Sequence, residues 1–150
     1  MVLQCVATDA SSLGMGVVAA PIAADTAVAV AALPPLHNAS SLAPTSWRTI
    51  ISYPWRHPEH INVLELRALS TCVRWVISHP SSNCRRLLLL SDSQVAVGAL
   101  SKGRSSSFQI LRRLRFISAM VLATGLQLYA RWIDSASNPA DGPSRGFTAH

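Results

Sequence analysis

Four of the seven acidic side chains in this 150-residue sequence stand where strands or helices are expected to begin or end. They are Asp9, Glu65, Asp92 and Asp141. Any one of them alone could be a turn former or a helix cap. Gathered at one edge of a sheet, however, they would repel one another and need cations to neutralise them. Carboxylate oxygens favour Mg²⁺ or Mn²⁺ over zinc, and two such ions about 3.5–4 Å apart suit in-line displacement at phosphorus.

Two apolar runs are the elements that would position a pair of these acids. Residues 2–8 form a short apolar run that ends at Asp9 and predicts a buried strand. Residues 86–90 form a continuous apolar run just before Asp92, typical of a strand covered on both faces. If the two strands are parallel neighbours, the two acids lie side by side at a strand spacing of about 4.8 Å. Their carboxyl ends are where open α/β sheets build their sites.

The clearest helix carries the third acid. Asn62 is expected to cap it, and Glu65 three residues later makes an Asn-x-x-Glu version of the capping box. Apolar residues then recur at helical spacing until Pro80 stops the helix. This places Glu65 in the first turn of a helix that connects the two strands.

The remaining pattern completes the list of elements. A second strand over residues 16–20 is expected to pair antiparallel with the first. The third strand has two candidates, Thr26 to Leu33 and Trp47 to Ser52, of which we prefer the second. The elements after Asp92, in chain order, are helices over 94–100 and 108–123, a strand over 126–132 and a turn or short helix over 138–145.

This order predicts an α/β fold in one domain that spans residues 1–150. Three strands form an antiparallel meander, and two right-handed helical crossovers add two parallel strands. The result is a mixed five-stranded sheet with helices on both faces.

Composition indicates an anionic partner. The net charge is +6, and all but one of the 13 positive side chains are arginine, which suits phosphate. Nucleic acid is the simplest such partner. Three cysteines without close spacing argue against a disulfide scaffold or a zinc site and suggest a reducing compartment.

The sequence predicts neither a membrane-spanning helix nor a signal peptide. Residues 14–36 are nearly uncharged, but Pro21, Asp25 and Pro34 interrupt them. No Lys or Arg precedes Arg48, whereas a signal peptide begins with positive charge. We therefore expect an intracellular protein, cytoplasmic or nuclear, without a membrane partner.

Four segments stand in this order along the chain: TDASSLGMG, HINVLELRAL, LLLLSDSQVAVGALSKGRSSS and RWIDSASNPADGPSR. Together they resemble the ribonuclease H domain of reverse-transcribing elements, and the last two are closest to those of tyrosine-recombinase (DIRS-type) and related retroelements. The resemblance covers both ends and the middle of the chain and leaves residues 21–58 unsupported.

The resemblance implies a ribonuclease H-like fold and hydrolysis of the RNA strand of RNA–DNA hybrids, leaving 5′-phosphate and 3′-hydroxyl ends. The family's metal-binding and catalytic carboxylates match the four acids named above, which would hold two Mg²⁺ or Mn²⁺ ions. Asn62 and Gln94 match positions that read the minor groove of the hybrid, where the 2′-hydroxyl distinguishes RNA from DNA. A reverse transcriptase domain in the same chain is a further implied partner, and we expect a monomer.

Basic residues after Asp92 supply candidate phosphate contacts. Lys102 and Arg104 stand in a Ser-rich loop before a helix start, which is a suitable phosphate cradle. We expect these two to contact the nucleic acid backbone. The following arginines, Arg112, Arg113 and Arg115, are expected to form a solvated helix face.

Two other functions remain open. One is a catalytically weak or inert ribonuclease H-like module that only binds nucleic acid, although all four acids are present. Many family members use a loop histidine for product release, and residues 133–140 contain none. The other is a transposase or integrase core, which uses a later helical Glu as a metal ligand; no Glu follows Glu65.

Overall fold

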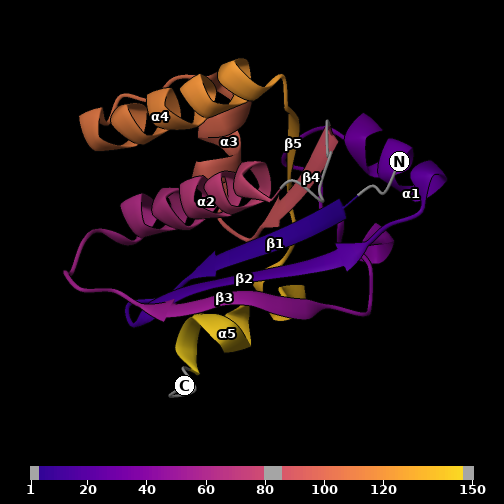
Figure 1. Ribbon diagram of the computed structural model, residues 1–150, viewed down its shortest axis with the longest axis horizontal. Helices are drawn as coiled ribbons and strands as arrows, with labels where there is room; N and C mark the ends of the chain where they lie inside the picture. The colour runs from indigo at the N-terminus through magenta and orange to yellow at the C-terminus, as the bar shows by residue number, and fades with distance from the viewer. Residues whose placement is uncertain (1–3, 80–85, 147–150) are drawn as a thin grey trace.

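A mixed five-stranded sheet forms the centre of the protein. The computed structural model describes residues 4–79 and 86–146. The strand order is β3-β2-β1-β4-β5, with β1 and its neighbours crossing the middle of the molecule (Figure 1). Strand β1 pairs antiparallel with β2 and parallel with β4, which in turn pairs parallel with β5. The bounds are β1 Gln4–Ala10, β2 Gly14–Pro21, β3 Arg48–Pro54, β4 Arg86–Ser91 and β5 Gln127–Trp132. The predicted mixed sheet is confirmed.

Helices lie on both faces of this sheet, as predicted. On one face lie α2 (Ile61–Ser78), α3 (Gln94–Lys102) and α4 (Phe108–Thr124), whereas α5 (Asp141–Arg145) lies on the other (Figure 1). Helix α1 (Ala24–Ala32) shares the second face, because its Val30 packs in the same apolar cluster as Ala140. Two short 3-10 turns, η1 (Ser40–Leu42) and η2 (Ser135–Ser137), complete the elements of the described residues. None of the described helices is long and apolar enough to cross a membrane.

Alternation along the central strands explains the continuous apolar run of β4. Leu87 and Leu89 pack into the cluster under α2, α3 and α4. Leu88 and Leu90 pack into the cluster on the opposite face. Successive side chains of a strand point to opposite faces, so a strand covered on both sides must be apolar at every position. The ends of β1 and β4 are thereby held between two cores.

The preferred third strand is confirmed and its alternative is wrong. Strand β3 covers Arg48–Pro54 and overlaps the run from Trp47 to Ser52. The run from Thr26 to Leu33 lies mostly in helix α1. Two of its valines differ in burial: Val30 lies in the core and is 1% exposed, whereas Val28 faces solvent and is 62% exposed. Alanine is the best helix former, and in this segment it outweighs the β-branched residues that suggested a strand.

The predicted cap of helix α2 is also wrong. His60, and not Asn62, is the N-cap residue, and its Nδ1 accepts a hydrogen bond from the backbone N–H of Asn62 at 3.1 Å. Helix α2 therefore begins at Ile61, and Glu65 makes no capping box. The Asn62 side chain is left for another role.

Helix α5 packs against β2 at a glycine. A Cβ atom built on Gly16 would lie 2.6 Å from the carbonyl oxygen of Ala140 and 2.8 Å from the backbone nitrogen of Ser144. The Ser11 hydroxyl also donates to the Ser144 carbonyl at 2.7 Å. Because two of the three nearest atoms are backbone and the third is Cβ of the rigid Pro143, α5 could not make room for a side chain without moving.

We expect Gly16→Ala to lower the free energy of unfolding by about 1–3 kcal/mol, the usual cost of overpacking a core. Gly98→Ala is the matched control, because a Cβ there meets nothing within 4 Å and Ala is favoured over Gly inside a helix by about 0.5–1 kcal/mol. Urea denaturation measures both. Equal stability of the two variants would contradict the close packing of α5 on β2.

Candidate metal centre

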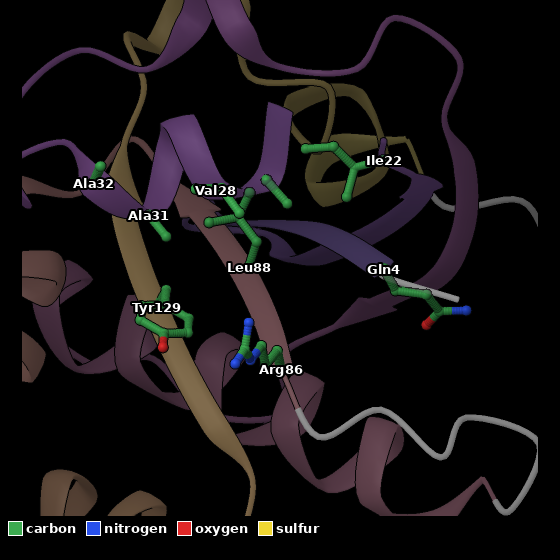
Figure 2. A pocket seen from close by; sticks show the side chains of 9 residues that line it. Gln4, Ile22, Val28, Ala31, Ala32, Arg86, Leu88 and Tyr129 are labelled. Carbon is green, nitrogen blue, oxygen red and sulfur yellow. The ribbon is translucent and has the colours of Figure 1, made fainter. Parts of the chain in front are cut away.

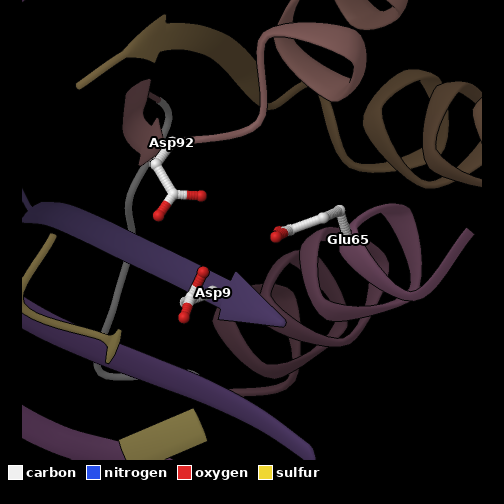
Figure 3. Close-up of side chains that lie close together, drawn as sticks. All are labelled: Asp9, Glu65 and Asp92. Carbon is white, nitrogen blue, oxygen red and sulfur yellow. The ribbon is translucent and has the colours of Figure 1, made fainter. Parts of the chain in front are cut away.

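Three acidic side chains meet at the carboxyl ends of the two central parallel strands. The register of β1 and β4 pairs Thr8 with Ser91, so the next residues, Asp9 and Asp92, follow from adjacent strands. Glu65 joins them from the second turn of α2, and its carboxylate points toward the two aspartates (Figure 3). Each residue offers one carboxylate oxygen, and these oxygens lie within 4.8 Å of one another. The predicted convergence of Asp9, Glu65 and Asp92 is therefore present in the fold.

Burial makes this arrangement electrostatically costly. Asp9 is 3% exposed and Glu65 is 5% exposed. The Oε2 atom of Glu65 is buried and has no hydrogen-bond partner among the described residues. An unpartnered buried carboxylate oxygen is unfavourable by several times the worth of an ordinary hydrogen bond.

Burial raises the pKa of all three carboxyls, and the charge of a neighbouring acid adds to each shift. Desolvation is the largest cause in each case. It raises the pKa of Asp9 to about 7, with the charge of Asp92 adding to the effect. It raises the pKa of Glu65 to about 9, with further contributions from Asp9 and Asp92. The pKa of Asp92 is raised as well, although hydrogen bonding with Asn138 and Asp9 opposes the shift.

These features fit a hard divalent cation. Three convergent carboxylates supply oxygen ligands of the kind that Mg²⁺ and Mn²⁺ prefer. A cation at this point would satisfy the unpartnered oxygen of Glu65 and offset the repulsion that raises the three pKa values. The donor set holds no thiolate or imidazole, which zinc would favour.

Asp141, the fourth predicted ligand, lies beside this group and not within it. Asp141 begins α5, and its Oδ1 accepts a hydrogen bond from Nε of Arg145 at 3.1 Å. Both side chains are exposed. The negative charge of Asp141 nevertheless raises the pKa of Asp9 and of Asp92. Asp141 is thus within electrostatic reach of the cluster, with an arginine as its present partner.

Two further residues of the site were not anticipated from the sequence. The Ser144 hydroxyl donates to Oδ2 of Asp9 at 2.8 Å, and Nδ2 of Asn138 donates to the Thr8 carbonyl at 3.1 Å. The Asn138 side chain also lowers the pKa of the Asp92 carboxyl. Both residues fall in the segment RWIDSASNPADGPSR, but nothing in the residue types marks them as buried.

A second polar contact joins the loop before α5 to the segment between β2 and β3. The Asp134 carboxylate accepts hydrogen bonds from Asn38 at 3.1 Å and from the Ser40 hydroxyl at 2.6 Å. The backbone N–H of Ala39 donates to the Trp132 carbonyl at 2.9 Å. The loop that leads to Asp141 is therefore attached to residues almost one hundred positions earlier in the chain.

Asn62 and Gln94 lie where a substrate could meet them. Together with Glu65 and Asp92 they line an open depression of about 540 Å³. Asn62 reaches it from the start of α2, and Gln94 from the first residue of α3, whose N-cap is Ser93. Both predicted substrate-reading residues are thus brought to the carboxylates.

Lys102 and Arg104 are placed elsewhere. Lys102 is the last residue of α3, and Gly103 ends the helix in the left-handed conformation. Gln94 begins the same helix at the site, so Lys102 lies about 12 Å away along the helix axis, at 1.5 Å per residue. Both basic side chains are exposed. A contact with nucleic acid there would be separate from the carboxylate cluster.

A second, more apolar cavity of about 320 Å³ lies at the opposite ends of the strands (Figure 2). Gln4 and Arg86, the first residues of β1 and β4, line it together with Leu88 and Tyr129. None of the three clustered acids contributes to this cavity. The clustered acids that could carry out chemistry are therefore at the carboxyl ends of the strands and not in this cavity.

The sheet order, the helices on both faces and the site of the acids define a ribonuclease H-like α/β fold. The N-terminal RNase H domain of Rv2228c from Mycobacterium tuberculosis is similar, with a TM-score of 0.58 and 18% identity over 96% of this chain and 94% of that one. RNase H1 from Halobacterium salinarum has a TM-score of 0.54 and 14% identity over 93% and 96% of the two chains.

LC11-RNase H1, solved in complex with an RNA/DNA hybrid, has a TM-score of 0.58 and 14% identity over 92% and 91% of the two chains. No protein-family model matches this chain, and no curated protein matches it significantly. At these identities the shared feature is the fold.

The raised pKa values predict how stability depends on pH without metal. An acid with a raised pKa in the folded state binds more protons than in the unfolded state, so the free energy of unfolding falls as the pH rises. For Asp9 the fall extends from its ordinary value of 3.8 to about 7, and for Glu65 from 4.5 to about 9. Each pH unit in these windows costs at most about 1.4 kcal/mol per group.

We therefore expect thermal melts in EDTA to show decreasing stability from about pH 5 to about pH 8. Glu65→Gln should flatten this dependence, and millimolar Mg²⁺ should remove most of it in the wild type. Asp25→Asn, which removes an exposed carboxylate from α1, is the control and should leave the pH dependence unchanged. A wild-type melting temperature that does not change with pH in EDTA would contradict the repulsion among the three acids.

Proposed function

We propose that this chain is a metal-dependent endonuclease that hydrolyses the RNA strand of RNA–DNA hybrids. The observation that carries the proposal is the set of three buried, convergent carboxylates on a ribonuclease H-like fold, one of which has an unpartnered oxygen. The products would carry 5′-phosphate and 3′-hydroxyl ends. The similar LC11-RNase H1 was solved with an RNA/DNA hybrid, which supports this class of substrate.

Asp9, Glu65 and Asp92 would hold two Mg²⁺ or Mn²⁺ ions, with Asp141 completing the ligand set from α5. Bound divalent ions activate an attacking water and stabilise the leaving oxygen of a phosphodiester. The ionised form of each carboxyl is the one that binds a cation, so metal binding would bring the raised pKa values down and release protons.

The surrounding residues orient these carboxylates. Ser144 fixes Oδ2 of Asp9, and Asn138, which is bonded to the backbone of β1, lowers the pKa of Asp92. Arg145 holds the Asp141 carboxylate at the rim of the site. Such hydrogen-bonded support preorganises ligands and is often nearly as important as the ligands themselves.

Asn62 and Gln94 would supply the choice of RNA over DNA. Both line the depression beside Glu65 and Asp92. An amide can donate to, and accept from, a 2′-hydroxyl, the group that DNA lacks. Lys102 and Arg104 would make phosphate contacts farther along α3, and binding would weaken with salt because phosphate contacts release counterions.

The resemblance to retroelement sequences also suggests the larger protein in which this domain would act. A reverse transcriptase domain in the same chain would deliver the hybrid, and the domain would work as a monomer inside the cell. The +6 net charge fits an anionic partner.

Two other functions make different predictions. An inert nucleic-acid-binding module would bind hybrid without cleaving it, and a transposase or integrase core would join strands of duplex DNA. Incubating the protein with hybrid, duplex DNA and duplex RNA, with and without Mg²⁺ or Mn²⁺, separates the three.

We expect Asp92→Asn to lower the rate of hybrid cleavage by about two to three orders of magnitude, a loss typical for a group that stabilises transition-state charge. Folding and hybrid binding should be retained, because the substitution removes a repulsive charge. Cleavage of an end-labelled hybrid under single-turnover conditions measures the rate. Asp25→Asn removes the same charge far from the site and should cleave like wild type, whereas Mg²⁺-dependent cleavage by Asp92→Asn at the wild-type rate would remove the site assignment.

We expect Gln94→Ala and Asn62→Ala each to lower kcat/KM on hybrid by about 3- to 10-fold, the worth of one hydrogen bond. The loss should shrink when the hybrid carries a single 2′-deoxy nucleotide at the contacted position, because the bond is then missing already. Equal losses on both substrates would show that these amides do not contact the 2′-hydroxyl.

A further inference from the structure

Arginines from two helices gather along the seam between α2 and α4, on a surface that the proposed chemistry does not use. We call this group the arginine strip; it comprises Arg67, Arg74, Arg112 and Arg113. The two helices run side by side on the same face of the sheet (Figure 1). Arg74 and Arg112 are exposed, and Arg67 and Arg113 are half-buried.

The spacing within each helix explains the alignment. Arg67 and Arg74 are seven residues apart, which places them on the same side of α2 about 10.5 Å apart along its axis. The two helices meet at this line of arginines, because the Arg74 guanidinium lies over the ring of Phe116 on α4. Burial, and then the charge of Arg67, lower the pKa of Arg113 on α4, with smaller contributions from Arg112 and Arg74. Glu59 is the acid that opposes this effect.

Aromatic side chains support the strip. The guanidinium of Arg67 lies 5.5 Å from the ring centroid of Trp55, and that of Arg74 lies 5.1 Å from the ring centroid of Phe116. Arg67 also pairs with Glu59. Among the described residues, Arg74 and Arg113 have no carboxylate within ion-pair distance. The strip therefore keeps an excess of positive charge that no described acid neutralises.

The strip begins next to the metal centre. Trp55, which supports Arg67, packs against Ala10 and Leu64, the residues that adjoin Asp9 and Glu65 in the chain. Its Nε1 donates to the Ser11 carbonyl at 2.9 Å. Arg74 lies nine residues after Glu65 on the same helix, about 13.5 Å farther along the axis. Along the axis, this separation corresponds to about four phosphate spacings of a duplex strand.

We propose that the arginine strip binds the phosphate backbone of the hybrid beyond the cleaved bond. This inference rests on the proposed function and adds a second phosphate contact to the one proposed for Lys102 and Arg104. One strand carries a phosphate every 3.4 Å along the duplex axis, so a strip about 10.5 Å long spans roughly three phosphates. Arginine suits this task because its planar guanidinium donates two parallel hydrogen bonds to phosphate.

The test compares Arg74→Gln and Arg113→Gln with wild type and with Arg48→Gln, which removes an exposed arginine from the first residue of β3. Binding of a fluorescently labelled 18-base-pair RNA–DNA hybrid is measured by anisotropy in EDTA over a range of NaCl concentrations. Cleavage kinetics are measured with Mg²⁺. Circular dichroism melts establish that each variant folds, and Arg113→Lys tests whether positive charge alone suffices.

Each strip variant should bind the hybrid several-fold more weakly at low salt. The slope of log K against log salt concentration should become shallower by about one for each arginine removed. KM should rise while kcat stays unchanged, and Arg48→Gln should bind like wild type. Glu59→Gln should bind more tightly than wild type, a gain that a purely structural role for Glu59 would not produce.

Wild-type affinity and salt slope in both strip variants would overturn the proposal. If wild type cleaves hybrid and the strip variants bind normally, the strip assignment is wrong and the proposed function stands. If wild type binds hybrid through the strip but cleaves no hybrid with Mg²⁺ or Mn²⁺, the proposed function is wrong and the strip stands.

Discussion

Three carboxylates that repel one another must be held together at the end of a sheet, and the rest of the structure serves this constraint. Asp9 lies near the end of β1 and Asp92 follows β4, so their separation is set by the hydrogen-bonded register of these parallel strands. Both strands are packed on both faces and cannot move apart without opening two cores. The packing of the two strands therefore holds the carboxylates together against their repulsion, which a bound cation would reduce.

The short helix α5 links the sheet to the rim of the site. Gly16 lets α5 lie directly on β2, and the Ser11 hydroxyl fixes the Ser144 carbonyl. The Ser144 side chain then holds Asp9. A single contact surface thus orients the buried Asp9 carboxylate and presents Asp141 beside it, from a helix of only five residues.

Sequence patterns predicted the sheet and most of the site because both follow from local signals. Continuous apolar runs marked β1 and β4, and the acids at their ends followed directly. The segment that forms helix α1 was considered only as a strand, because a run of alanine and valine suits a helix or a strand. His60 was not predicted as the N-cap of α2, because histidine is an uncommon residue at that position. Ser144, Asn138 and the arginine strip depend on contacts between distant segments, which residue types and spacing alone do not reveal.

The attachment of Asp134 to Asn38 and Ser40 has a thermodynamic consequence for substrate binding. The loop between β5 and α5 is fixed at its start by this contact and near its end by Asn138 on Thr8. A segment tethered at two points has lost most of its conformational entropy during folding of the chain. Docking of a ligand against it then requires little additional ordering, so more of the interaction energy is expressed as affinity.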